Sequence, residues 1–159
     1  FYQAWLLNPK NPEVYAGFGS VLHDQGKNCD AMEMMAPPLT LPHPTFPGLY
    51  PDAARITTLC AVSDTTLSPE AKAELMARSE TLYKKAEEVE PDKRYIYSSW
   101  ATAYYWRGQY SEAWRMVAKA RALGTGSGAI AGLPSGAVNE PNEHFLNLLR
   151  KKMAEPVHQ

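Results

Sequence analysis

The chain has 159 residues and a formal net charge of −1, and 45% of its residues are hydrophobic. This length is enough for one domain with a real core. The near-neutral charge argues against a nucleic-acid-binding protein, which usually carries a basic stripe, and against a polybasic membrane-binding segment. No apolar run approaches the roughly 20 residues of a membrane span.

A first helical hairpin is predicted over residues 11–36. Asn11–Glu13 combines a favourable N-cap residue, a proline in the first turn and an acid, which is typical of a helix start. The apolar face of the first helix recurs at one-, three- and four-residue steps: Tyr15, Phe18, Gly19 and Leu22. The turn falls at Gln25–Lys27, and we expect Pro37 and Pro38 to end the second helix early.

The next segment, residues 37–51, contains six prolines and Gly48. This composition predicts extended, polyproline-like chain with turns. We interpret it as an insertion between hairpins, with a functional loop as the alternative. Its less polar side chains suggest that it packs on the scaffold: His43, Phe46, Leu49 and Tyr50.

A second, longer hairpin is predicted over residues 52–91. Its first helix is expected at Asp52–Ser63. The run Ser68–Glu70 is a strong helix start, with an N-cap residue, a proline and an acid, and the helix should continue to about Val89. Its predicted core-facing stripe is Leu75, Leu82, Ala86 and Val89.

The clearest hairpin lies at residues 95–124. Large and small apolar residues predict a helix over about Tyr95–Arg107, and Gly108 suits the left-handed conformation that ends a helix. Ala113, Val117 and Ala120 repeat at i, i+4 and i+7 on the second helix. Helices joined by so short a turn must pack antiparallel.

The C-terminal part divides into a flexible linker at residues 125–136 and a capping helix with a tail at residues 137–159. The linker is rich in Gly, Ser and Ala. The helix is expected at about Glu140–Met153, with apolar positions Phe145, Leu148, Leu149 and Met153. The linker is long enough to bring this helix onto a concave face of the same chain or onto a second molecule.

The hairpin at 95–124 resembles a tetratricopeptide repeat (TPR), a helical hairpin of about 34 residues. The positions that carry the resemblance are Tyr97, Trp100, Ala101, Tyr104, Gly108, Tyr110, Ala113, Val117 and Ala120. Residues 12–36 also fit the pattern, whereas residues 52–91 diverge from it. The resemblance implies an all-α array of helical repeats (an α-α superhelix) over residues 1–124. The usual proline after the second helix is missing, so we expect the array to end near Gly124.

By the same resemblance, residues 1–10 look like the end of a repeat whose beginning is absent, with a frayed leading helix as the alternative. The chain begins at Phe1 rather than at methionine, which is compatible with removal of an N-terminal part. An orphan helix at this end exposes an apolar face unless another segment covers it.

The resemblance implies a non-catalytic scaffold that binds a protein or peptide in a concave groove. The residues expected to line this groove are Glu13, Ala16, Ser20, His23, Tyr95, Ser98, Thr102 and Tyr105. The family's clamp for chaperone C-termini uses Lys, Asn and Arg, which are missing here. Two alternatives stay open: a homo-oligomer formed through the repeat ends or the C-terminal helix, and an accessory subunit of an enzyme or cell-envelope complex.

No enzyme motif stands out. None of the four histidines has a metal-ligand spacing, and the nucleotide-binding glycine motifs are missing, so we expect neither a metal nor a cofactor. In stacked repeats, Cys29 and Cys60 could lie at the same edge. They are either a disulfide or two unrelated thiols. A disulfide favours an oxidising compartment such as the bacterial periplasm over the cytoplasm.

Overall fold

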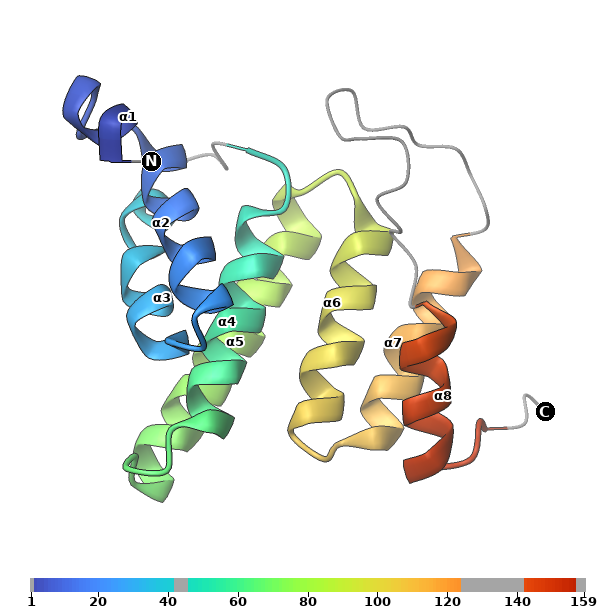
Figure 1. The fold of residues 1–159 in the computed structure, drawn as a ribbon. Helices are drawn as coiled ribbons and strands as arrows, with labels where there is room; N and C mark the ends of the chain where they lie inside the picture. Colours follow the sequence, from blue (N-terminus) through green and yellow to red (C-terminus); the bar gives the residue numbers. More distant parts are fainter. Residues whose placement is uncertain (1, 42–45, 124–141, 157–159) are drawn as a thin grey trace. The chain divides into compact units, whose positions relative to one another are not determined.

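The computed structural model describes residues 2–41, 46–123 and 142–156 (Figure 1). In these ranges the regular structure is entirely helical, with eight α-helices and one 3₁₀ helix, which confirms the predicted all-α class. None of the described helices is both long and apolar enough to cross a membrane. The chain forms two compact units, Phe1–Glu90 and Pro91–Gln159.

The first unit contains two helical hairpins preceded by a short helix. Its elements are α1 (Tyr2–Leu7), α2 (Pro12–Asp24), α3 (Asn28–Met34), η1 (Pro37–Thr40), α4 (Leu49–Ser63) and α5 (Pro69–Val89). Helices α2 and α3 pack against each other, as do α4 and α5, and α3 also packs on α4. The predicted helix starts are confirmed: Asn11 Oδ1 accepts a hydrogen bond from Glu13 N at 3.0 Å, and Ser68 Oγ accepts one from Ala71 N at 3.1 Å.

The prediction of extended chain over residues 37–51 is wrong at both ends of the segment. Residues 37–40 form η1, and α4 begins at Leu49 rather than at Asp52. Pro51 is tolerated in α4 because the first N–H groups of a helix have no intrahelical acceptor to lose. Phe46 packs on the core, as expected, while His43 lies outside the described residues.

The core of the first unit forms where α3 meets α4. It contains Ala31, Met35, Leu49, Ala53 and Ile56. Gly19 of α2 approaches this core so closely that a Cβ atom there would lie 2.6 Å from Met35 Cγ. The glycine therefore sets the distance between α2 and α3.

The buried face of α5 overlaps the predicted stripe only in part: Ala86 is buried, and Leu82 packs against the core while half-buried. Ser79, Tyr83 and Ala86 are buried, whereas Leu75, Leu82 and Val89 are only half-buried. Ser79 Oγ donates to the carbonyl of Ala54 at 2.8 Å and lies 2.9 Å from Thr58 Oγ1, so α4 satisfies this hydroxyl. The apolar pattern places the buried face of α5 incorrectly because Ser79 is buried but is not an apolar residue.

The second unit contains α6 (Lys93–Trp106), α7 (Tyr110–Ala122) and α8 (Glu143–Lys152). Helices α6 and α7 form the predicted antiparallel hairpin, and α8 lies beside α7 (Figure 1). The start of α8 is fixed by Asn142 Oδ1, which accepts a hydrogen bond from Phe145 N at 2.8 Å. Its buried residues are Leu146 and Leu149, so of the four predicted apolar positions only Leu149 is buried; Phe145 and Leu148 are half-buried and Met153 is exposed. The predicted linker at 125–136 lies outside the described residues.

The turns of the first and third hairpins have the same hydrogen-bonding pattern. Gly26 (φ +76°) and Gly108 (φ +74°) both adopt the left-handed conformation. Gly26 N donates to His23 O at 2.8 Å and Gly108 N to Tyr105 O at 3.0 Å, while the following residues, Lys27 and Gln109, donate to the carbonyls of Leu22 and Tyr104 at 2.9 Å. This double closure of the last helical turn is the Schellman motif.

Candidate binding surfaces

The predicted groove positions fall into two sets, one on α2 and one on α6, in different units. On α2, Glu13 and Ser20 are exposed, while Ala16 is only 7% exposed and belongs to the core. Ser20 Oγ donates to the carbonyl of Ala16 at 3.1 Å. His23 is half-buried, and its Nδ1 lies 2.8 Å from Asn28 Oδ1. On this helix, Glu13 and Ser20 are therefore the predicted positions most open to a ligand.

On α6 the four predicted residues are half-buried. Thr102 Oγ1 donates to the carbonyl of Ser98 at 3.1 Å. The ring of Tyr105 lies edge-on to Phe145 of α8, with 5.8 Å between the centroids. The chain's own C-terminal helix therefore contacts the Tyr105 end of this row, away from Tyr95.

A more exposed apolar surface lies on α1. This helix has no charged residue and buries none of its side chains. Its large apolar residues are exposed to different degrees: Tyr2 64%, Trp5 37%, Leu6 59% and Leu7 88%. If each side chain presents about 200 Å² when fully exposed, these residues together offer about 500 Å². That is the size of the largest apolar patch on a typical monomer, and such patches are often functional.

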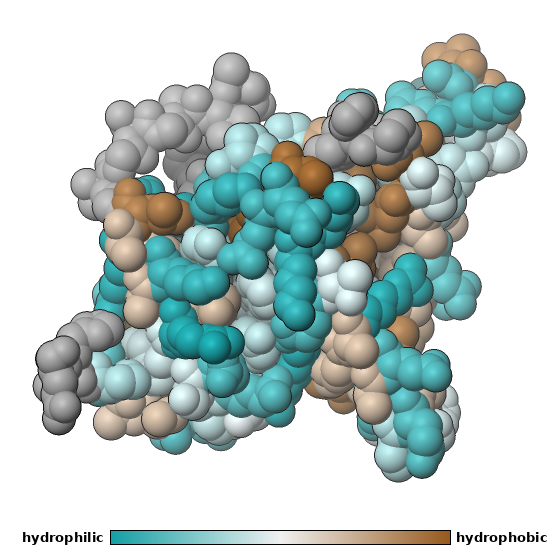
Figure 2. Space-filling model, turned by 180° about the vertical axis from the view of Figure 1, so that it is seen from behind, coloured by the Kyte–Doolittle hydropathy of each residue, from teal (hydrophilic) through white to brown (hydrophobic). Residues whose placement is uncertain are grey.

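Helices α2 and α3 extend this surface. Tyr2, Trp5, Tyr15, Phe18 and Met34 line a shallow cavity of about 450 Å³. The rings of Tyr2 and Trp5 stack with 6.1 Å between centroids. Tyr15 Oη donates to the carbonyl of Pro9 at 2.9 Å, which fixes the turn between α1 and α2. We call the exposed residues of α1 together with this cavity the α1 surface; α1 lies at the upper right of Figure 2, where hydrophobic (brown) and hydrophilic (teal) side chains both appear.

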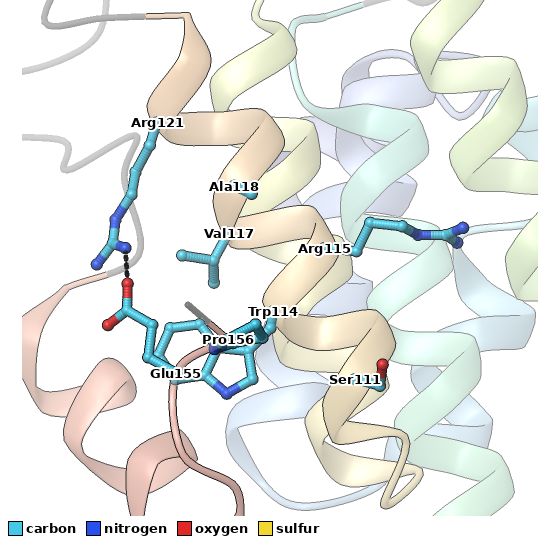
Figure 3. A pocket seen from close by; sticks show the side chains of 8 residues that line it. All are labelled: Ser111, Trp114, Arg115, Val117, Ala118, Arg121, Glu155 and Pro156. Carbon is cyan, nitrogen blue, oxygen red and sulfur yellow. Dashed lines mark hydrogen bonds and ion pairs between the residues drawn. The ribbon is translucent and has the colours of Figure 1, made fainter. Parts of the chain in front are cut away.

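A second cavity, of about 300 Å³, lies in the other unit between α7 and the segment that follows α8 (Figure 3). Its lining residues are Ser111, Trp114, Arg115, Val117, Ala118, Arg121, Glu155 and Pro156. Trp114 Nε1 donates to the carbonyl of Met153 at 3.1 Å, and Arg121 pairs with Glu155. Arg115 extends away from Glu155 and pairs with Glu112 at 2.5 Å.

Glu155 joins two arginines from different helices. Besides Arg121 of α7, Arg150 of α8 lies 3.4 Å from it, and Arg150 also pairs with Glu143 at 3.2 Å. The hydrogen bond from Arg121 holds the pKa of Glu155 below its usual value. The hydrogen bond to Glu143 raises the pKa of Arg150. Each charged group in this chain of ion pairs thus has a partner of opposite charge, although all of the side chains are partly exposed.

The energy that holds α8 on α7 is modest. Leu146 is 4% and Leu149 is 0% exposed, and burial of each contributes about 1.5–3 kcal/mol. Ion pairs between exposed groups add about 0–1 kcal/mol each. A helix of 10 residues is marginal in water on its own, so ordering it costs part of this gain.

Cys29 and Cys60 form a disulfide that ties α3 to α4, with 4.6 Å between their Cα atoms. Of the two alternatives, the structure has the disulfide. Asp64 Oδ2 lies 3.7 Å from Cys29 Sγ, which is a contact rather than a hydrogen bond because a disulfide sulfur has no proton to donate. Cys60 is only 1% exposed.

Within the described ranges, no three His, Cys, Asp or Glu side chains gather into a group that could hold a metal ion. No motif in the sequence assigns a function to Trp114, Arg121 or Glu155. Glu155 follows an amphipathic helix, and the residues around it in the sequence do not indicate that its partner lies on α7.

Comparisons with protein-family models, with curated proteins and with solved structures found no match to this chain.

Proposed function

We propose that the chain is a non-catalytic, TPR-like scaffold that binds an amphipathic helix of a partner protein on the α1 surface. The observation that carries the proposal is the exposure of α1: a helix without charges presents two aromatic and two leucine side chains to solvent. Every other α-helix in the described residues has at least one buried residue. A free apolar helix face of this kind is stabilised when a second helix packs on it.

The repeat architecture is supported by local geometry. The turns at Gly26 and Gly108 have the same left-handed glycine and the same pair of closing hydrogen bonds. Each follows a helix of similar length, 13 residues in α2 and 14 in α6. The first and third hairpins therefore share their turn geometry, which supports their reading as related repeats.

The exposed area of the large apolar residues of α1 favours a single helix over a second copy of the chain. A stable interface of standard size takes about 800 Å² from each partner, and α1 offers about 500 Å². The absence of charge on α1 favours an apolar stripe with leucines at i, i+3, i+4 and i+7, the pattern of helices that lie in apolar grooves. Homo-oligomerisation and a role as an accessory subunit stay as alternatives.

The predicted groove residues remain a second part of the proposal as two separate sets, one on α2 and one on α6, each within its own unit and limited to its accessible positions. The disulfide supports an oxidising compartment such as the periplasm.

A titration followed by amide NMR tests the α1 surface. The probe is a designed amphipathic helix with the leucine pattern given above, and its counterpart is a peptide of the same composition in scrambled order. We expect the designed helix to shift the signals of residues 2–7 and of Tyr15 and Phe18, and the scrambled peptide to leave them unchanged. Equal shifts with both peptides would show non-specific apolar adsorption and would contradict the proposal.

A pair of matched variants locates the binding. Replacing Leu6 and Leu7 together by serine should lower the affinity of the chain for the designed helix at least tenfold. Leu123→Ser changes a similarly exposed leucine (48%) in the other unit and should have no effect. If sedimentation instead shows a dimer that the Leu6/Leu7 variant abolishes, the surface serves self-association rather than a partner helix.

A further inference from the structure

The C-terminal residues 142–156 lie along α7 in the way that a bound peptide lies on its receptor. Their contacts are of three kinds. Leu146 and Leu149 are buried. Phe145 meets the ring of Tyr105 edge-on. Beyond the helix, the carbonyl of Met153 accepts a hydrogen bond from the indole N–H of Trp114. Glu155 pairs with Arg121 (Figure 3).

On the receptor side, four residues make a surface with defined preferences, which we call the α7 surface: Tyr105, Trp114, Val117 and Arg121. Val117 is 1% exposed and Trp114 is 3% exposed with the C-terminal segment in place. The indole N–H of Trp114 binds a main-chain carbonyl, which any peptide has. Arg121 binds a carboxylate, which only an acidic residue or a chain end has.

The resident segment is built as a separable piece. Beyond Leu146 and Leu149, the other side chains of α8 are half-buried or exposed. Its polar anchors are also accessible, with the Arg121 and Glu155 side chains 43% and 35% exposed. The cavity of about 300 Å³ beside Trp114 shows that the segment does not fill the surface that it covers. A short helix of this kind is marginal without its support.

We propose that the α7 surface is a docking site for a short amphipathic helix followed by a glutamate, that residues 142–156 occupy it as a resident ligand, and that a segment of the same chemistry in a partner protein binds by displacing them. The resident segment defines the chemistry of the partner: two leucines three positions apart on one face, a basic helix end, and an acidic residue in the extended chain beyond it. This inference concerns a different unit from the α1 surface and holds whether or not that surface binds a helix.

Binding of a labelled peptide with the sequence of residues 142–156 tests the site on the full chain. In the wild-type chain the resident segment competes, because it is present at the high effective concentration of a tethered ligand. Leu149→Asp puts a charge into the buried position of the resident helix and leaves the α7 surface itself unchanged. We expect the peptide to bind the Leu149→Asp chain at least tenfold more tightly than the wild type, and equal affinity for both chains would overturn the proposal.

A charge exchange tests the orientation of the ligand. In the Leu149→Asp background, Arg121→Glu should lower the affinity of the chain for the peptide at least tenfold. A peptide that carries Glu155→Arg should recover most of the lost affinity. Arg115→Glu is the matched control, because Arg115 lines the same cavity but pairs with Glu112. Failure of the exchanged peptide to recover affinity, or an equal loss with Arg115→Glu, counts against the assigned site.

Hydrogen exchange of the unmodified chain gives a test that does not depend on the folding of any variant. Separable docking requires the amides of α8 to exchange through local opening, faster than those of α6 and α7. Exchange of all three helices in one cooperative event would overturn the proposal. So would light scattering that shows a wild-type dimer lost in the Leu149→Asp chain, because a second copy would then supply the ligand.

Discussion

The carboxylate of Glu90 accepts a hydrogen bond from the backbone N–H of Gly48 at 2.6 Å, although the two residues are 42 positions apart. Its other oxygen accepts one from Tyr50 N at 2.9 Å. Glu90 directly follows α5, and Gly48 and Tyr50 lie at the start of α4. The first N–H groups of a helix have no intrahelical acceptor, and a negative charge there is favoured by the helix dipole. Glu90 therefore joins the two helices by capping one with the end of the other.

Removing this cap should destabilise the first unit. Glu90 is 3% exposed, so Glu90→Ala leaves two buried donors without an acceptor, and we expect a loss of about 3 kcal/mol in the free energy of unfolding. Glu90→Gln keeps one acceptor and should lose less. Denaturant unfolding measures both. Glu88→Ala, at a side chain 67% exposed, is the control and should stay within about 0.5 kcal/mol. Equal effects at the two positions would show that the cap contributes nothing.

Gly19→Ala tests the close approach of α2 and α3. Alanine is the better helix former by about 1 kcal/mol. However, the added Cβ would lie 2.6 Å from Met35 Cγ and 3.3 Å from the carbonyl oxygen of Ala31. Met35 is 2% exposed and has little room to move. We expect a net loss of about 1–2 kcal/mol in stability, because overpacking a core outweighs the gain in propensity.

The control for Gly19 is Ser20→Ala, a change at the neighbouring exposed position of the same helix. It should alter stability by less than about 0.5 kcal/mol. Thermal or denaturant unfolding of the two variants is compared with the wild type. Stabilisation by Gly19→Ala would mean that α2 and α3 can separate at little cost.

Much of the fold could be predicted because its signals are local. Asn11 and Ser68 cap the helices that they were expected to start, and Gly108 ends α6. Each signal works within one turn of the chain, where spacing alone decides which groups can meet. The prolines after Met35 end α3, as their missing N–H groups require.

The errors concern residues whose partners are distant in sequence. The start of α4 was placed too late because its cap, Glu90, comes from the end of α5. The buried face of α5 was misread because Ser79 is satisfied by Ala54 and Thr58 of another helix. A polar residue looks exposed in a sequence until its partner is known.

The same limit applies to the binding surfaces. An exposed apolar face at the N-terminal end was expected, and α1 has one. The contacts that Met153 and Glu155, just beyond α8, make with Trp114 and Arg121 join residues 34–39 positions apart and leave no periodic trace. The row of groove residues on α6 was chosen by helical spacing, which places side chains on one face but does not show what covers them. At Tyr105 that cover is Phe145.

The disulfide between Cys29 and Cys60 should contribute substantially to the stability of the first unit. It closes a loop of 31 residues, for which the chain-entropy model gives about 3–4 kcal/mol. We expect the denaturant midpoint of the wild type to fall when a reductant is present throughout the unfolding series. A Cys29→Ala/Cys60→Ala chain should unfold at the same midpoint with and without reductant. An unchanged wild-type midpoint would show that the cross-link does not constrain the unfolded chain.

Acid should release α8 before it unfolds the α6–α7 hairpin. Arg121 of α7, through its hydrogen bond, and Arg150 of α8 hold the pKa of Glu155 below 4.5 in the folded chain. A carboxyl with a depressed folded pKa stabilises at pH values above its unfolded pKa, and this contribution is lost as the pH falls through the folded value. The protection of α8 amides against exchange should therefore be constant above about pH 5 and decline below about pH 4.5.

The decline should depend on Glu155 itself. Glu155→Gln removes the titrating group, so α8 should be less protected at neutral pH and nearly insensitive to pH between about 5 and 3. Glu143→Gln is the matched control: Glu143 also pairs with Arg150, but its side chain is 76% exposed and this ion pair stays within α8. That chain should keep the wild-type dependence, with amides of α6 and α7 reporting any general acid unfolding. A Glu155→Gln chain with an unchanged acid transition would show that the ion pair with Arg121 does not hold α8 in place.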